Sequence, residues 1–358
     1  MCILYQTASF LIKYVRHHQT PSINQSINII IPRNQTRKKT NKMTSTTPTT
    51  TKKEISTKMP YETKYLSVLD GKAKMAYVEA GKGDPILFLH GNPTSKYLWR
   101  NIMPYLEKSG GHVVAVDLIG MGESDKPEDC NYRFLDHYQY LESFIQTKFN
   151  LKDTEKKKKL TLVIHDWGSA LGFHYACCNP TQIKGIAFME AIVDTMSWSN
   201  FPTDYKIGFT LMRTPYIGSA LVQGLNFFVK IILPQAIVRT LTQEEKDEYA
   251  KPFPTFASRK PTYVWPNEIP IDEYPKDNYD IVKRYNRWLK EGDSKDIPKL
   301  MITAKPGGII TPELADEIMK DIPNIKRVDM TTTSGVHFIQ EDDPHFIGEE
   351  ISKWYSEL

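Results

Sequence analysis

Short apolar runs alternate with longer amphipathic stretches over most of this 358-residue chain. Such runs are typical of strands that are covered on both faces, and their alternation with helical stretches predicts a mostly parallel sheet between two helical layers. The expected strands are 86–89, 113–116, 160–164, 186–189, 300–303 and 326–330. Two further runs, 65–69 and 73–79, meet at Asp70-Gly71 and predict a β-hairpin, which completes an eight-stranded α/β fold.

The pattern changes between Glu190 and Lys299, where helical stretches are interrupted by several prolines. An insertion at this point lies near the carboxyl ends of the strands, where open α/β sheets bind ligands. We therefore expect a helical cap at 193–296, inserted between two parts of the core at 59–192 and 297–358.

Residues 1–58 differ in composition from the rest of the chain. The first 53 residues carry nine Lys or Arg and no Asp or Glu, and Asn, Thr, Ser, Lys and Pro dominate 19–58. Such a segment buries too little apolar area to order itself, so we expect a disordered basic leader at 1–58. A transit peptide or a start codon placed too early are alternatives, since Met43 and Met59 lie close to the first strand.

Charge, hydropathy and cysteines exclude several classes of function. Beyond residue 53 the chain has 37 basic and 42 acidic residues, a net charge of −5, which gives no support for nucleic-acid binding. The apolar runs of the leader are too short for a membrane span. The four cysteines show no metal-ligand spacing, and no dinucleotide or phosphate-binding fingerprint is present, so we expect no metal and no cofactor. A reducing, cytoplasmic location fits the cysteine pattern.

The most informative segment is 160–172, in which an apolar strand runs into His165-Asp166-Trp167-Gly168 and a helix rich in small residues. This is the arrangement of a nucleophile elbow in α/β-hydrolases, with Asp166 in the position of the usual serine. A carboxylate is ionised at neutral pH and attacks without a base to remove a proton. The competing interpretation is that Asp166 only caps the following helix.

Two other segments supply groups that this chemistry needs. The loop His90-Gly-Asn-Pro-Thr-Ser95 follows an apolar strand, where α/β-hydrolases place one backbone N–H of an oxyanion hole, and the second N–H belongs to Trp167. His337 follows the last strand and a glycine, as a catalytic base would. An ordinary Asn-Pro loop and an isolated surface histidine are the alternatives.

The acid that orients His337 is predicted by elimination. The strand at 299–303 runs into Ala304-Lys-Pro-Gly307, which holds no carboxylate. The preceding strand, by contrast, ends at Glu190 after an apolar run. A buried carboxylate without a partner is costly, so Glu190 is expected to face His337 rather than simply reach solvent.

These segments resemble those of haloalkane dehalogenases, and more narrowly the subfamily whose catalytic acid follows the sixth strand and which also contains Renilla-type luciferase. The resemblance spans about residue 65 to the C-terminus, cap included. The segments that carry it are His90-Gly-Asn-Pro-Thr-Ser95, Tyr97-Leu-Trp-Arg-Asn101, 117–127, 165–173, 259–270 and 335–342.

The resemblance implies a role for each candidate residue. Asp166 would attack a carbon that carries a halogen, and the Asn92 amide and the Trp167 indole N–H would bind the departing halide. His337, held by Glu190, would then activate a water that hydrolyses the alkyl ester on Asp166.

A second activity within the same family stays open. Renilla-type luciferases share these five residues and oxidise coelenterazine with O₂, so the partner is either a haloalkane, with halide as product, or coelenterazine plus O₂, and a bifunctional enzyme is a third option. Either substrate needs an apolar chamber. The cap and the residue after the base offer side chains for its lining: Phe209, Phe227, Phe228, Leu233 and Phe338.

Overall fold

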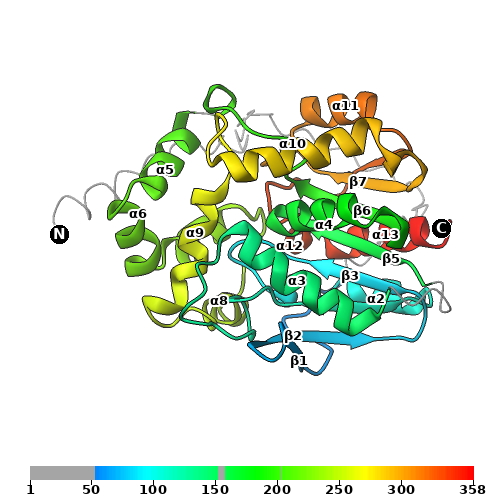
Figure 1. The fold of residues 1–358 in the computed structure, drawn as a ribbon, viewed down its shortest axis with the longest axis horizontal. Helices are drawn as coiled ribbons and strands as arrows, with labels where there is room; N and C mark the ends of the chain where they lie inside the picture. Colours follow the sequence, from blue (N-terminus) through cyan, green and yellow to red (C-terminus); the bar gives the residue numbers. More distant parts are fainter. Residues whose placement is uncertain (1–52, 152–157, 202) are drawn as a thin grey trace, which may run out of the picture. The chain divides into compact units, whose positions relative to one another are not determined.

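The computed structural model describes residues 53–151, 158–201 and 203–358, and its core is one eight-stranded sheet (Figure 1). The strand order is β1-β2-β4-β3-β5-β6-β7-β8. β1 and β2 form an antiparallel hairpin, β2 is antiparallel to β4, and every other pair is parallel. The strands are β1 Lys64–Val68, β2 Ala73–Ala80, β3 Pro85–Leu89, β4 His112–Val116, β5 Leu160–His165, β6 Ile183–Ala191, β7 Lys299–Thr303 and β8 Ile325–Asp329.

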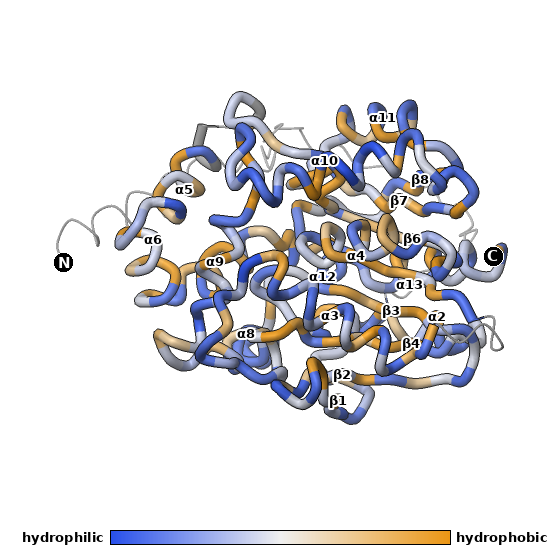
Figure 2. The backbone as a smooth tube through the Cα atoms, viewed as in Figure 1, coloured by the Kyte–Doolittle hydropathy of each residue, from blue (hydrophilic) through white to orange (hydrophobic). Residues whose placement is uncertain are grey.

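All eight predicted strands are confirmed, and so is the α/β-hydrolase fold. Every residue of β3 and β5 is buried, which matches their mostly apolar sequences and their central place in the sheet. In Figure 2 these strands form an apolar centre, and the more polar residues lie on the surrounding helices.

Helices cover both faces of the sheet. α3 (Phe134–Phe149), α4 (Asp166–Cys178) and α10 (Lys276–Glu291) pack side by side on one face, while α2 (Met103–Lys108) and α13 (Pro344–Tyr355) pack together on the other (Figure 1). α11 (Pro312–Asp321) packs on β8, and α12 (Ile339–Asp342) directly precedes α13. Short 3-10 turns lie at Lys96–Trp99, Pro180–Gln182 and Asp293–Asp296.

The segment between β6 and β7 is helical, as expected for a cap. Its first element is a 3-10 turn at Trp198–Asn200. Its last long helix is α10, which packs on α4 in the layer that covers one face of the sheet. The exact bounds of the cap, 193–296, stay a prediction. The elements between are α5 Thr203–Arg213, α6 Ile217–Ser219, π-helical turns Ala220–Gly224 and Phe228–Ile232, α7 Leu233–Gln235, α8 Gln243–Ala250, a 3-10 turn Ala257–Arg259 and α9 Lys260–Glu268.

The predicted leader mostly lies outside the described residues, which begin at Lys53. Residues 53–58, which the sequence analysis places in the leader, are part of the folded body. Ser56 exchanges hydrogen bonds with the side chain of Asn101, and Thr57 donates to Glu244 of α8. These polar contacts order a segment that has almost no apolar side chains, so the predicted boundary at residue 58 is too late.

Among the described residues no single helix has the length and apolar character needed to cross a bilayer. One bent pair, Ile217–Gly224 with Phe228–Gln235, meets that test only when its two parts are taken together, with a bend of 65° between them.

Candidate active site

Asp166 lies at the sharp turn between β5 and α4. Its φ is +48°. Residues other than glycine rarely adopt this left-handed backbone conformation, which costs about 1–3 kcal/mol. The turn brings α4 very close to β3. A Cβ on Gly168 would lie only 2.3 Å from the carbonyl oxygen of Leu89, so a side chain does not fit there. The strained turn presents the Asp166 carboxylate at the carboxyl end of the sheet, as predicted for a nucleophile elbow.

The loop after β3 closes over this carboxylate. The backbone N–H of Asn92 donates to Asp166 Oδ2 at 2.8 Å, and the backbone N–H of Trp167 also acts on the carboxylate. Burial raises the pKa of Asp166, while the charge of His337 and the two N–H groups act in the opposite direction, and the net pKa is above its ordinary value. The two N–H groups predicted for an oxyanion hole therefore meet at the carboxylate of Asp166.

His337 lies between two carboxylates. Its Nε2 is 3.8 Å from Asp166 Oδ1, and its Nδ1 is 3.5 Å from Glu190 Oε2. Burial lowers the pKa of His337, but the hydrogen bond to Glu190 and the charges of Asp166 and Glu190 outweigh it, so the net pKa is raised. The imidazole is thus placed to take a proton on the side that faces Asp166, while Glu190 faces its other nitrogen.

Glu190 is held by backbone groups that the sequence analysis missed. Its Oε2 accepts the N–H of Gly308 at 2.9 Å and that of Ile309 at 2.6 Å, in addition to facing His337. Its own φ is +43°, so the end of β6 is strained like the elbow. The loop after β7 does contribute to orienting His337, through backbone N–H groups that stabilise the negative charge on Glu190.

Helix α9 contacts both predicted halide donors. The Trp167 ring stacks on Trp265 with centroids 4.5 Å apart, and Trp265 stacks on His137 of α3 at 4.1 Å. The side-chain amide of Asn92 is 3.5 Å from the carbonyl oxygen of Thr262, also on α9. Burial lowers the pKa of His137 to about 3, so this stack ends in a neutral ring at neutral pH. Stacking on both sides of Trp265 limits how the Trp167 indole can turn.

Comparisons with known proteins agree with this geometry. A family model described as the alpha/beta hydrolase fold matches residues 84–344. A haloalkane dehalogenase of Sphingobium indicum is 41% identical over 303 residues, which cover 84% of this chain and 97% of the relative. One of Mesorhizobium japonicum is 39% identical, with coverage of 82% and 91%. This chain belongs to the haloalkane dehalogenase family.

Solved structures of the family give the same result for the fold. The crystal structure of haloalkane dehalogenase DbeA from Bradyrhizobium elkani has a TM-score of 0.75 and 38% identity, covering 82% of this chain and 97% of that chain. A structure of a putative ancestral haloalkane dehalogenase also has a TM-score of 0.75 and 38% identity, with coverage of 82% and 98%. Family membership therefore extends over the cap as well as the core.

The five side chains predicted to line a substrate chamber of this family member lie in different surroundings. They are Phe209, Phe227, Phe228, Leu233 and Phe338. The Phe338 ring is 4.6 Å from that of its chain neighbour His337, centroid to centroid. Phe228 is buried in a small apolar cluster of the cap with Phe209 packed against it, Leu233 belongs to the main core, and Phe227 is half-buried. Their part in a chamber stays a prediction.

His165, the residue before Asp166, is a second histidine of the site that the sequence analysis assigned no role. Its Nε2 lies 2.9 Å from the carbonyl oxygen of His337, and its ring centroid is 4.7 Å from that of His337. Burial moves the pKa of His165 well below its ordinary value, and the nearby His337 acts in the same direction. A neutral His165 therefore donates to the backbone of His337 and adds no charge near the base. The signal was its place at the end of a fully buried, mostly apolar strand.

Substitution of Gly91 by Ala should damage the site without unfolding the protein. A Cβ at this position would lie 2.1 Å from Asp166 Oδ2, so the carboxylate must move away from the Asn92 N–H. A displacement of about 1 Å in a reacting group costs on the order of 100-fold in rate. Halide release by G91A should fall by that factor while the melting temperature changes little.

Gly224→Ala is the matched control, since a Cβ there meets nothing within 4 Å. Equal activity of the two variants would contradict a close fit of Gly91 against the nucleophile.

Proposed function

We propose that this family member is a haloalkane dehalogenase, a hydrolase that converts a halogenated alkane and water into an alcohol, a halide ion and a proton. One observation carries the proposal: Asp166, His337 and Glu190 face one another in a buried row, with His337 3.8 Å from Asp166 and 3.5 Å from Glu190. An ionised carboxylate next to an oriented base suits a two-step displacement and hydrolysis.

In the first step Asp166 is the nucleophile. A carboxylate oxygen forms a bond to the carbon of the substrate as the carbon–halogen bond breaks, and the electron pair of that bond leaves with the halide. Negative charge moves from Asp166 to the halide, where the Trp167 indole N–H and the Asn92 amide are proposed to donate hydrogen bonds. Trp167 suits this role because an indole is a donor only and cannot compete as a base.

In the second step His337 acts on water. The imidazole accepts a proton as the water oxygen attacks the carboxyl carbon of the ester, and the oxyanion that forms is stabilised by the backbone N–H groups of Asn92 and Trp167. Collapse of this intermediate releases the alcohol and restores the Asp166 carboxylate. Glu190 stabilises the imidazolium, and that proton then passes to solvent.

Bromide release from 1,2-dibromoethane tests the proposal. The purified chain should release many bromide ions per active site, and Asp166→Asn should release none above the background. A parallel assay with coelenterazine and O₂ counts photons, because luciferase activity was the alternative from the sequence. Light emission without bromide release would overturn the proposal in favour of that alternative.

A cytoplasmic location also stays a proposal. Cys130, Cys177 and Cys178 are free thiols in the described part of the chain, which suits a reducing compartment. Fluorescence microscopy of the full chain fused to a reporter at its C-terminus would test this location.

A further inference from the structure

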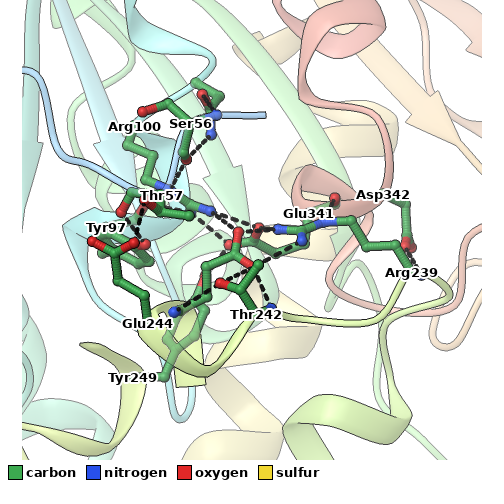
Figure 3. A network of polar contacts seen from close by, with 12 residues as sticks. Ser56, Thr57, Tyr97, Arg100, Arg239, Thr242, Glu244, Tyr249, Glu341 and Asp342 are labelled. Carbon is green, nitrogen blue, oxygen red and sulfur yellow. Dashed lines mark hydrogen bonds and ion pairs between the residues drawn. The ribbon is translucent and has the colours of Figure 1, made fainter. Parts of the chain in front are cut away.

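A buried network of charged side chains joins Arg239 of the cap to Glu341 (Figure 3), which follows His337 closely in the chain. Arg100 follows the 3-10 turn Lys96–Trp99. It donates to both carboxylate oxygens of Glu341 at 2.6 and 2.9 Å and to Glu245 of α8 at 2.9 Å. Arg239 also binds both carboxylates, Glu245 and Glu341. The side chains of Arg100, Glu245 and Glu341 are each only 1% exposed. Charges this deeply buried are tolerated only because each one is paired.

Backbone contacts link the same two segments. We call residues 337–342 the base turn and residues 236–245 the cap linker. The carbonyl oxygen of Ala236 accepts the N–H groups of His337 and Phe338 at 3.1 and 3.2 Å. Asp342 Oδ1 accepts the N–H groups of Val238 and Arg239 at 2.8 and 3.0 Å. The cap linker therefore holds the base turn at its first and its last residue.

The side-chain contacts of His337 alone hold it loosely. Its two nitrogen–oxygen distances, 3.8 Å to Asp166 and 3.5 Å to Glu190, exceed those of strong charge-assisted hydrogen bonds. The position of the imidazole thus depends also on its backbone. The N–H of His337 is bonded to Ala236 of the cap linker, and its carbonyl oxygen to His165 of the core. Because catalytic geometry is sensitive to shifts of about 1 Å, a change in the cap linker should act on His337.

The nucleophile is held in a different way. Asp166 is fixed by the turn between β5 and α4 and by the N–H of Asn92, which are all parts of the core. None of the contacts described for the cap linker involves Asp166 or Asn92. The nucleophile of the first step is therefore held by core residues, whereas the base of the second step lies on a turn that is bonded both to the cap linker and, through His165, to the core.

We propose that Arg239 is a positioning residue for the second step: through Glu341 and the backbone of the base turn, the cap linker keeps His337 in place for ester hydrolysis. This inference rests on the proposed function. None of the contacts described for Arg239 involves Asp166, His337 or Glu190. Its loss should slow hydrolysis of the alkyl ester and leave displacement of the halide nearly unchanged.

Rapid-quench kinetics with 1,2-dibromoethane test this on Arg239→Gln. We expect a first turnover of bromide release within about 3-fold of the wild-type rate, followed by steady-state turnover at least 10-fold slower. Intact-mass spectrometry during turnover should show the alkylated protein in excess over the free form. Arg239→Lys, which keeps the charge, should recover part of the steady-state rate.

Arg133→Gln is the matched control. Arg133 also makes ion pairs at 2.9 Å with two carboxylates, Glu268 and Asp277, and ties another part of the inserted segment to α3, but none of its described contacts reaches the base turn. This variant should change both steps by less than 3-fold. If R133Q accumulates the alkyl-enzyme as R239Q does, the effect is a general loosening of the cap and the inference is wrong.

Asp342→Ala is a second variant that tests the same link between the cap linker and the base turn if R239Q folds poorly. It removes the acceptor of the Val238 and Arg239 N–H groups and should also slow hydrolysis selectively. Equal slowing of both steps, or no slowing of either, overturns the inference. Failure of the wild-type chain to release bromide would instead contradict the proposed function, so the two failures are distinct.

Discussion

Replacement of Asp166 by Asn should abolish halide release, with a loss of about 10⁴-fold or more in turnover, as is typical when a catalytic nucleophile is removed. The amide has nearly the same shape as the carboxylate, so the packing of the elbow is kept. It has no negative charge, however, and is a poor nucleophile toward carbon. Bromide release from 1,2-dibromoethane measures the loss.

Asp194→Asn is a suitable control for this experiment. Asp194 pairs with Lys283 at 2.8 Å on the partly exposed segment after β6 and lies outside the buried row of catalytic candidates. D194N should retain nearly full turnover. Turnover of D166N equal to that of D194N, with mass spectrometry confirming that the introduced side-chain amide has not hydrolysed back to a carboxylate, would rule out Asp166 as the nucleophile.

Replacement of His337 by Phe should allow the first step of the reaction, release of the halide, and block the second step, hydrolysis of the ester. Displacement of the halide requires only Asp166 and the halide donors, so each protein molecule should release one bromide ion and keep the alkyl group as an ester. Hydrolysis then lacks its base, and general base catalysis contributes typically 10²–10⁴-fold. Digestion and mass spectrometry should locate the added mass on Asp166.

His345→Phe provides the comparison for a histidine outside the site. His345 contacts Tyr105 and the carbonyl oxygen of Glu54, far along the chain from Asp166. It should turn over normally and carry no adduct. Multiple turnovers by H337F at the wild-type rate would show that another group supplies the base.

The sheet and the elbow could be predicted from sequence because local patterns define them. The strands β3 and β5 are mostly apolar runs, and the turn at Asp166 follows β5 directly. Glu190 was also predictable, because a carboxylate at the end of a buried strand requires a partner. These features depend on residues that are close together in the chain.

The contacts that hold the site could not be predicted in the same way. Gly308 and Ile309 bind Glu190 through backbone N–H groups, which every residue except proline carries and which therefore leave no signature. Arg100 and Glu341 are 241 positions apart, and no periodic pattern relates them. The ordered segment 53–58 has no apolar pattern, and hydrogen bonds to Arg100 and Asn101 hold it in place. Polar contacts between residues far apart in the chain are thus the part of this fold that could not be predicted from the sequence.

The electrostatic interaction between His337 and Asp166 couples the two proposed steps. While Asp166 is a carboxylate, its charge helps to raise the pKa of His337 and favours an imidazole that holds a proton. In the proposed intermediate Asp166 is an uncharged ester, so the pKa of His337 should fall there. The imidazole then gives up its proton more readily and can accept one from water. Formation of the ester would thereby favour the neutral imidazole that is needed to hydrolyse it. The interaction between these two side chains would thus set the order of the two steps.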